Sequence, residues 1–346
     1  MPHKFITVAN RKIGLNFPPL VIAEIGINHN GSLAVAKEMA QAAISAGAEI
    51  IKHQTHIPDE EMSTEARHAI PGNSDYSIYD IMARCALSEA DELALKQFIE
   101  KQNTIFISTP FSFAAADRLA KFGVPAYKIG SGEMNNLPLV DYIASMGKPI
   151  FLSTGMNNLD SVKRTVDVIT KHHEQFALLH TTNVYPTPAH LIRLGALEEI
   201  KRAFPGEIIG LSDHSLNNLA CLAATALGAS ILERHFTDRK DRPGEDIVCS
   251  MTPQELAELK KQSAEIARMR GGNKTAAAEE EVTIQFAFAS VVAQRDIAAG
   301  QVVQATDLIT KRPAGGIPAA DLPKVIGKTA RHAIKKGTQL LWKDFQ

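Results

Sequence analysis

Eight apolar segments of β type recur along the first two thirds of the chain, and most are followed by a stretch with helical spacing. The segments are LVIAEI (20–25), AEIIKHQ (48–54), TIFIST (104–109), AYKIGS (126–131), PIFLST (149–154), FALLHTT (176–182), EIIGLS (207–212) and SILERHF (230–236). Strands that alternate with helices predict a parallel sheet covered by helices. Eight such units within about 250 residues favour a closed (β/α)₈ barrel. An open, doubly wound sheet is the alternative.

The helical stretches carry their own signals. They are AVAKEMAQAAISAGA (34–48), SEADELALKQFIEKQN (88–103), LDSVKRTVDVITKHH (159–173), NNLACLAATALGAS (217–230) and a last helix at 254–270. Ser88 followed by acidic residues is typical of a helix start, because a hydroxyl accepts from free backbone N–H groups and carboxylates favour that end of the helix dipole. A short hairpin over residues 3–17 is expected before the barrel.

The composition changes after the last of these helices. We expect a hairpin and barrel over residues 1–269, a polar linker rich in small residues over 270–286, and a second domain over 287–346. Short runs broken by Gly and Pro predict that this second domain is small and has little regular structure.

The overall charge excludes some classes of partner. Lys and Arg number 37 against 38 Asp and Glu, so no broad basic surface is available for nucleic acid or an anionic membrane. No apolar run approaches the roughly 18 residues of a membrane span. Cys85, Cys221 and Cys249 are far apart in the sequence, which suggests neither a disulfide framework nor a zinc cluster. The start of the chain lacks the apolar stretch of a signal peptide, so a reduced, cytoplasmic protein is expected.

Polar residues cluster where the predicted strands end, which is the edge that carries the active site of a (β/α)₈ barrel. Lys52, Lys128, Glu233 and His235 lie within otherwise apolar runs. An unpaired buried charge costs several kcal/mol. We therefore expect each of them to have a partner, and a bound substrate or metal is the natural one.

The residue types at these strand ends predict two kinds of chemistry. Two lysines with Ser and Thr hydroxyls and an Asn amide form a compact site for an anion, and phosphate is the expected ligand. His214 and His235 come from neighbouring strands at the same level. Such a pair suits one divalent metal ion that keeps open positions for substrate.

Taken together, these motifs resemble the N-acetylneuraminate (sialic acid) synthase family. The motifs that carry the resemblance, in order along the barrel, are AEIGINHNGS (23–32), IKHQTH (51–56), STPFS (108–112), KIGSGE (128–133), LSTGM (152–156), NVYPTP (183–188), GLSDHS (210–215) and ERHFT (233–237). The C-terminal segments KRPAGG (311–316) and GKTARHAIKKGTQL (327–340) resemble the antifreeze-like (SAF) domain of these synthases.

The resemblance implies a metal-dependent barrel with a C-terminal SAF domain, working as a domain-swapped homodimer. It implies a phosphoenolpyruvate site made of Lys52, Thr109, Lys128, Ser131, Ser153, Asn183 and Ser212. It implies that His214 and His235 hold one divalent ion per site, Mn²⁺ or else Mg²⁺ or Co²⁺. The implied sugar contacts are Glu24, Gln54, Tyr185 and Asp246, with Arg312 reaching over from the partner chain.

The implied reaction condenses phosphoenolpyruvate, N-acetyl-D-mannosamine and water to N-acetylneuraminate and phosphate, with C–O cleavage. The segments HQTHIPDEEMSTEA (53–66), IPGNSDYSIYDIM (70–82) and RHFTDRKDRPGEDIVCSM (234–251) resemble synthases of bacterial capsule and surface polysaccharides. Relatives that make legionaminic or pseudaminic acid from 6-deoxy diacetamido sugars share the barrel motifs, so those products remain an alternative.

The carboxylate that deprotonates water in this reaction is expected to be Glu133, with Glu24 as second choice. For each of them, an ion pair with a neighbouring lysine is the competing interpretation.

Two functions from other classes also fit parts of the sequence. The first is an aldolase or lyase that forms a Schiff base at Lys52 or Lys128, although such a lysine needs an apolar pocket or a nearby cation. The second is a non-catalytic ice- or sugar-binding module, which leaves the polar strand ends of the barrel without a purpose.

Overall fold

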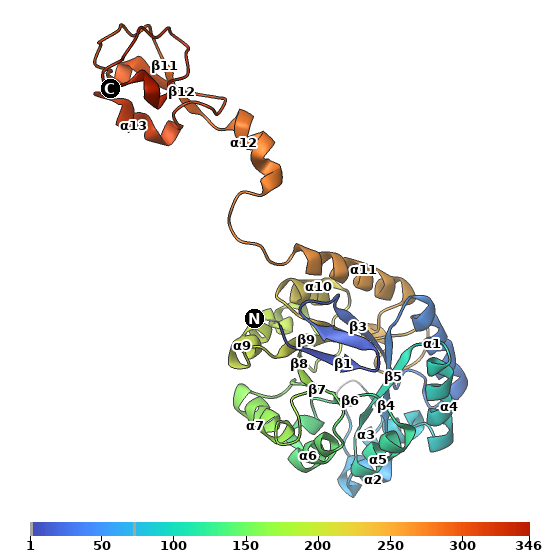
Figure 1. Cartoon of the computed structure of the whole chain (residues 1–346). Coiled ribbons are helices and arrows are strands. Elements are labelled where there is room, and N and C mark those ends of the chain that lie inside the picture. Colours follow the sequence, from blue (N-terminus) through green and yellow to red (C-terminus); the bar gives the residue numbers. More distant parts are fainter. Residues whose placement is uncertain (1–2, 72–73) are drawn as a thin grey trace. The chain divides into compact units, whose positions relative to one another are not determined.

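The computed structural model describes residues 3–71 and 74–346, so positions 72 and 73 of the IPGNSDYSIYDIM motif lie outside the described residues. The chain forms two compact units, Met1–Gly271 and Gly272–Gln346 (Figure 1). No helix in the described residues is both long enough and apolar enough to span a membrane.

The first unit opens with a hairpin and continues into a closed barrel. In the hairpin, β1 (Phe5–Val8) pairs with β2 (Arg11–Gly14) in antiparallel fashion. Eight strands then close on themselves in the order β10-β3-β4-β5-β6-β7-β8-β9. They are β3 (Leu20–Gly26), β4 (Ile50–Thr55), β5 (Ile105–Pro110), β6 (Tyr127–Ile129), β7 (Ile150–Ser153), β8 (Phe176–Thr181), β9 (Ile208–Asp213) and β10 (Ile231–His235). The predicted (β/α)₈ barrel is confirmed, and the open sheet is wrong.

Helices surround these strands (Figure 1). Ser88 accepts from the backbone N–H of Asp91 and starts its helix as predicted. A capping box formed by Thr252 and Glu255 starts the last helix of the unit, because each side chain accepts from the other residue's backbone N–H. The helices are α1 (Leu33–Ser45), α2 (Pro58–Glu61), α3 (Ile78–Cys85), α4 (Glu89–Glu100), α5 (Phe113–Phe122), α6 (Leu137–Ser145), α7 (Leu159–Ile169), α8 (Ala189–Ile192), α9 (Leu194–Ala203), α10 (Leu219–Ala226) and α11 (Pro253–Met269).

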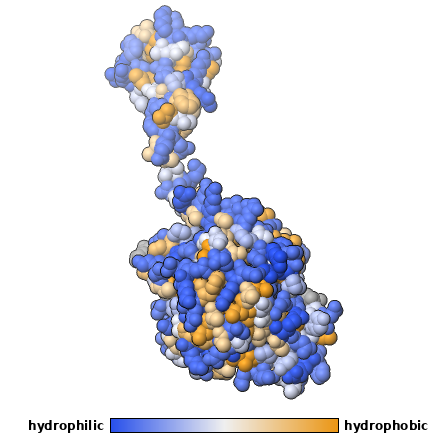
Figure 2. All heavy atoms as spheres, turned by 90° about the vertical axis from the view of Figure 1, so that its right-hand side faces the viewer, coloured by the Kyte–Doolittle hydropathy of each residue, from blue (hydrophilic) through white to orange (hydrophobic). Residues whose placement is uncertain are grey.

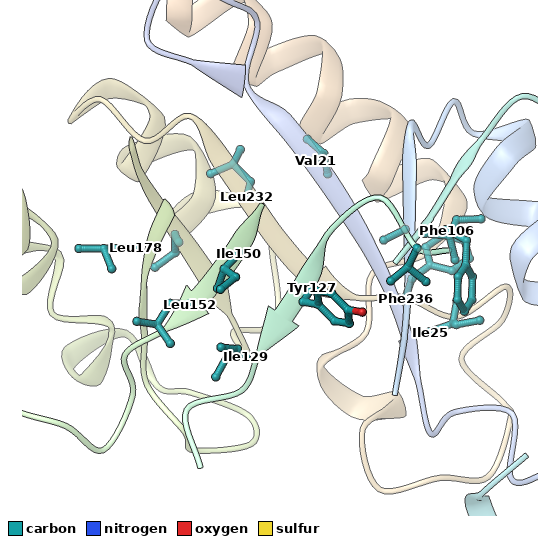
Figure 3. Packing of buried hydrophobic residues seen from close by; sticks show 14 of the residues in the cluster. Val21, Ile25, Phe106, Tyr127, Ile129, Ile150, Leu152, Leu178, Leu232 and Phe236 are labelled. Carbon is teal, nitrogen blue, oxygen red and sulfur yellow. The ribbon is translucent and has the colours of Figure 1, made fainter. Parts of the chain in front are cut away.

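The alternation of side chains along each strand divides the core into two layers. One layer packs between strands and helices, and Figure 3 shows part of it, with Phe106, Tyr127 and Leu232 among its members. The other layer fills the barrel interior, where Ile22 and Ile50 come from neighbouring strands. In β4 the same alternation places Lys52, two residues after Ile50, on the interior side.

The N-terminal hairpin contributes to the interior layer. Its buried residues Ile6, Val8 and Ile13 belong to the same cluster as the inward-facing apolar side chains of the strands. Most of those apolar side chains come from the first half of their strands, and the polar ones follow toward the carboxyl end. The hairpin therefore covers the end of the barrel opposite the polar residues.

The second unit has little regular structure, as predicted. It contains α12 (Glu281–Ala287), β11 (Ser290–Ala293), β12 (Leu308–Lys311) and α13 (Leu322–Val325), with an antiparallel pairing of the two strands. Val291, Val303 and Leu340 belong to its own buried core. The segment expected to be a linker, 270–286, includes most of α12, so part of it is helical. The surface visible in Figure 2 is mostly hydrophilic, with a band of hydrophobic residues on the first unit.

The position of the hairpin leads to a first prediction. Ile13→Ala should lower the free energy of unfolding by about 2–5 kcal/mol, because it leaves a cavity in the interior layer. Michaelis constants should stay unchanged, since the polar end of the barrel is not touched. Chemical denaturation with activity assays measures both. Thr7→Ala, on the exposed side of the same hairpin, is the control and should stay within about 0.5 kcal/mol. Equal stability of the two variants would contradict this role for the hairpin.

Candidate active site

A cavity of about 380 Å³ opens at the carboxyl ends of the barrel strands. This volume lies in the range typical of small-molecule sites, roughly 300–1,000 Å³. Nearly all the site residues predicted from the sequence line it: Lys52, Gln54, Thr109, Lys128, Ser131, Glu133, Ser153, Asn183, Tyr185, Ser212, His214, His235 and Asp246. Glu24 lies directly beneath, in contact with Lys52 and Gln54.

Four buried charges form the floor of the cavity. Lys52 makes an ion pair with Glu24, and its Nζ lies 3.6 Å from Glu233 Oε1. Lys128 Nζ lies 3.4 Å from the same oxygen of Glu233. The sequence analysis expected a bound substrate or metal as the partner of these charges. For the two lysines the barrel itself supplies carboxylate partners, Glu24 on the strand next to that of Lys52 and Glu233 on β10.

The neighbours of these lysines shift their pKa values in opposite directions. Burial alone lowers the pKa of Lys52, but the carboxylates of Glu233 and Glu24 outweigh it and raise the pKa above its ordinary value. Burial prevails at Lys128, where Glu233 opposes it and the charge of Lys52 adds to it, so the pKa is lowered. At Glu233 the two lysines overcome burial and lower the pKa. The floor therefore consists of four ions that stabilise one another.

Hydroxyl and amide groups surround Lys52 and Lys128. Lys52 Nζ donates to Thr109 Oγ1 at 3.1 Å. The backbone N–H of Gly155 donates to Ser131 Oγ at 3.0 Å. Within the described part of the chain, Ser153 Oγ and Asn183 Oδ1 are buried without a hydrogen-bond partner. Buried polar atoms left without a partner are costly, so they mark a place where a polar ligand binds.

The two histidines expected to bind metal are neighbours in space. The rings of His214 and His235 have centroids 5.4 Å apart. His214 Nδ1 donates to the carbonyl of Thr182 at 2.8 Å, which leaves the lone pair of Nε2 free. His235 Nδ1 is buried without a hydrogen-bond partner among the described residues and lies 3.5 Å from Asp246 Oδ2.

The protonation of these rings fits metal binding. Burial, reinforced by the neighbouring His235, lowers the pKa of His214 to about 4. Burial also lowers the pKa of His235 to about 4. Both rings are thus neutral at pH 7, as a metal ligand must be. Among residues 3–71 and 74–346, no group of three or more His, Cys, Asp or Glu side chains surrounds one point. An ion held here would have two histidine ligands and complete its shell with water or substrate.

Tyr185 and Asp246 form the wall beside the histidines. The ring of Tyr185 stacks on His214 with 4.0 Å between centroids. Burial raises the pKa of Asp246 to about 6, although the nearby His214 lowers it. A carboxyl group in this state either donates to or accepts from a sugar hydroxyl.

The two carboxylates considered as base differ in their surroundings. Glu24 is held by Lys52 and also accepts from Gln54 Nε2 at 3.1 Å. Glu133 has no ion-pair partner within the described residues, although Lys128 is close enough to act on it electrostatically. Burial raises the pKa of Glu133 to about 7, and Lys128 reduces that rise. The competing interpretation of an ion pair therefore holds for Glu24 and not for Glu133.

Sequence reasoning missed several residues of the site. Glu233 was noted as a charge in an apolar run, but not as the partner of both lysines. His56 lines the cavity and is buried together with Glu61. The signal for His56 was its spacing, since it lies four residues after Lys52 at the carboxyl end of the same strand.

Arg234 was also missed. It is fully buried on the outer face of β10, next to His235. It donates at 2.7 Å to the carbonyl of Ser215 and to Asn218 Oδ1, and its Nε lies 3.4 Å from Asp213 Oδ2. Arg234 thus fixes the segment that carries His214. An arginine inside an apolar run was the only signal available.

Arg312 lies in the second unit, in the bend after β12. Its side chain is exposed. The structure describes that unit by itself, so the expected contact of Arg312 with the sugar remains a prediction.

The fold and the site define a (β/α)₈-barrel enzyme whose mouth suits an anionic substrate rich in oxygen atoms. Comparison with known proteins identifies its family. The model of the NeuB family matches residues 39–275, and that of the SAF domain matches residues 288–346. The chain therefore belongs to the NeuB family and is a phosphoenolpyruvate-dependent nonulosonic acid synthase, a transferase. Enzymes of this family generally depend on a metal ion.

Individual relatives make different products. The N,N'-diacetyllegionaminic acid synthase of Campylobacter jejuni is 37% identical, over 92% of this chain and 97% of the relative. The human N-acetylneuraminate-9-phosphate synthase is 31% identical, over 95% of this chain and 93% of the relative. A crystal structure of the N-acetylneuraminic acid synthetase of Leptospira borgpetersenii, in complex with citrate, is 30% identical with a TM-score of 0.75, and covers 82% of this chain and 95% of that one. Family membership sets aside the lyase and the non-catalytic module.

The crowding around the anion site leads to a second prediction. A Cβ at Gly155 would collide with Asn183 Oδ1 and stand 2.8 Å from Ser131 Oγ. Gly155→Ala should therefore raise the KM for phosphoenolpyruvate by about tenfold or more, which is the effect of losing one or two good hydrogen bonds. Steady-state kinetics measures it. Gly195→Ala, where the added methyl meets nothing within 4 Å, is the control, and an unchanged KM in Gly155→Ala would count against phosphate binding here.

Proposed function

We propose that the chain joins phosphoenolpyruvate to N-acetyl-D-mannosamine and water, and releases N-acetylneuraminate and phosphate. The observation that supports an anion as substrate is that Lys52, Lys128, Ser153 and Asn183 line the same cavity. The resemblance of segments 53–66, 70–82 and 234–251 to synthases for bacterial surface polysaccharides supports N-acetylmannosamine. The relatives named as legionaminic acid synthases support a second candidate, a 6-deoxy diacetamido sugar.

In this proposal the phosphoenolpyruvate site comprises Lys52, Thr109, Lys128, Ser131, Ser153, Asn183 and Ser212. The lysines supply positive charge, and the hydroxyls donate to phosphate or carboxylate oxygens. Asn183 offers its amide N–H to the ligand, and its unpaired Oδ1 binds a water or a protonated oxygen. Gln54, Tyr185, Asp246 and Glu24 form the sugar side.

The proposed chemistry makes one C–C bond, forms a C–O bond between water and C2, and breaks the C–O bond between C2 and the bridging oxygen of the phosphate. C3 of phosphoenolpyruvate attacks the aldehyde carbon of the open-chain sugar, which leaves positive character at C2. A water molecule adds to C2 while Glu133 accepts its proton. The tetrahedral intermediate then expels phosphate with the bridging oxygen, leaving the 2-keto acid. Glu133 is suited to the proton transfer because its pKa of about 7 lies near the working pH.

We propose that His214 and His235 hold one divalent ion, Mn²⁺ or else Mg²⁺ or Co²⁺. Their neutral rings, the free Nε2 of His214 and the unpaired Nδ1 of His235 support this assignment. When bound, such an ion supplies Lewis-acid activation of a carbonyl oxygen. Arg234 and Thr182 orient the segment that carries His214.

We further propose a homodimer in which the second unit of one chain completes the site of the other. Exposed apolar residues lie in the segments that follow β7, β8, β9 and β10: Met156, Val184, Leu216, Leu219 and Val248. Val282, Phe286 and Phe288 are exposed on and just after α12. Apolar surface of this kind is typical of an interface between proteins. Arg312, with five N–H donors, suits sugar hydroxyls and an acetamido carbonyl.

The third prediction tests the reaction. Phosphate release from phosphoenolpyruvate should require an amino sugar, because the sugar supplies the aldehyde carbon that C3 attacks. Release should be fastest with N-acetylmannosamine, the proposed acceptor. Parallel assays offer the 6-deoxy diacetamido sugars instead. Chelator should stop release and Mn²⁺ should restore it. Faster phosphate release with a diacetamido sugar would identify that sugar as the acceptor in place of N-acetylmannosamine. Phosphate release that continues in the presence of chelator would contradict the proposed metal dependence.

The fourth prediction concerns the base. A base acts when deprotonated, so with a pKa of about 7 at Glu133 the rate should rise through pH 7 and level off above it. At pH 6 it should be about a tenth of the plateau. Glu133→Gln should lower kcat by about 10²–10⁴-fold and remove this rising limb of the pH–rate profile. Glu24→Gln is the comparison: it should lose activity but keep the limb. A limb that persists in Glu133→Gln would assign the base elsewhere.

The fifth prediction concerns the dimer. Arg312→Ala and His235→Ala should each be inactive or nearly so, but mixing them should return activity. In a swapped dimer a mixed pair carries one site with both defects and one with neither. Equal mixing therefore yields about a quarter of the wild-type rate. Mass spectrometry confirms that subunits have exchanged. Exchange without recovered activity would contradict a shared site.

A further inference from the structure

A buried His–Glu pair lies in the wall of the cavity. His56 follows β4 directly, and Glu61 ends the short helix α2. His56 Nδ1 lies 3.0 Å from Glu61 Oε1, and each side chain is only 3% exposed. The His56 ring stacks on Phe111 with 4.2 Å between centroids, and both residues line the cavity.

The other nitrogen of His56 faces Gln54. His56 Nε2 lies 3.1 Å from Gln54 Oε1, and Gln54 Nε2 lies 3.1 Å from Glu24 Oε1. Glu24 makes an ion pair with Lys52. The amide of Gln54 must therefore turn its NH₂ toward Glu24, because its carbonyl would be repelled there. That orientation directs the amide oxygen at His56.

The orientation assigns a proton to one nitrogen of the ring. Gln54 Oε1 is an acceptor, so His56 Nε2 donates to it. On the other side of the ring, His56 Nδ1 and the buried carboxyl group of Glu61 share a hydrogen bond of 3.0 Å. Replacing Glu61 by glutamine keeps the shape of this partner and removes its acidic group.

We propose that His56 and Glu61 form a positioning pair that holds the amide of Gln54 in one orientation for sugar binding. In that orientation Gln54 gives one N–H to Glu24 and offers the other to the cavity. The sugar group that meets Gln54 is then an acceptor, a hydroxyl oxygen or an acetamido carbonyl. This inference rests on the proposed function, in which Gln54 contacts the sugar.

A second observation connects the pair to the proposed base. Glu61 adds to the rise in the pKa of Glu133, after the larger effect of burial. The pair is therefore coupled to both carboxylates of the site: to Glu24 through the hydrogen bonds of Gln54, and to Glu133 through the charge of Glu61.

The test begins with Glu61→Gln, which keeps the shape of the side chain and removes its charge. The KM for the sugar should rise about tenfold, the difference between a charge-assisted and a weaker hydrogen bond. The KM for phosphoenolpyruvate should change less than about twofold, because no member of the pair touches the lysines or hydroxyls of the anion site. Glu60→Gln, an exposed carboxylate of the same helix, is the matched control and should match the wild type.

A double-mutant cycle distinguishes positioning from a general structural role. If the pair acts through Gln54, Glu61→Gln should have no further effect on sugar KM in a Gln54→Ala background. Equal effects in both backgrounds would overturn the proposal, as would an unchanged KM in Glu61→Gln. His56→Gln repeats the cycle if Glu61→Gln unfolds at a lower temperature than the wild type. The wild type is first assayed with each sugar of the panel, so failure of N-acetylmannosamine as substrate is recorded separately, and the cycle uses the sugar that reacts.

Discussion

The mutual neutralisation of Glu24, Lys52, Lys128 and Glu233 is the interaction on which the site depends. Each of these ions lies inside the barrel, where its transfer from water costs several kcal/mol unless it is paired. Alternation along parallel strands brings them to one level of the interior. Removal of one member would leave the cluster with one uncompensated buried charge. The cluster therefore restricts which residues the mouth of this barrel tolerates.

This neutrality affects how an anion binds. Two lysines and two carboxylates carry no net charge, so the mouth does not attract phosphoenolpyruvate through an excess of positive charge. The ligand gains instead from fixed hydrogen-bond donors: the lysine ammonium groups, the hydroxyl of Ser153, whose Oγ has no partner among the described residues, and the amide N–H of Asn183. These groups pay no reorganisation cost when the ligand arrives. An almost neutral chain thus binds an anion through local geometry.

The strands were predictable from the apolar runs of the sequence, and the polar residues at their ends from the place of the active site in a (β/α)₈ barrel. Tyr185 and Asp246 were predicted through the family resemblance. The ion pairs among the buried charged residues could not be predicted. Lys128 and Glu233 belong to β6 and β10, which are not neighbours in the barrel. Their contact crosses the interior, and its geometry depends on strand tilt and stagger that no local pattern encodes. The partner of each lysine was therefore assigned to a ligand and proved to be a carboxylate.

His56 and Glu61 show a different limit of sequence reasoning. Glu61 lies in a four-residue helix with three acidic residues in its first turn, a composition that predicts an exposed turn. Its burial results from the position of His56 at the end of β4, which is a tertiary contact. The proton arrangement then follows from a chain of acceptors that begins at Glu24. The same carboxylate that pairs with Lys52 thus also contacts Gln54, and this contact turns the NH₂ group of the amide toward Glu24 and its oxygen toward His56.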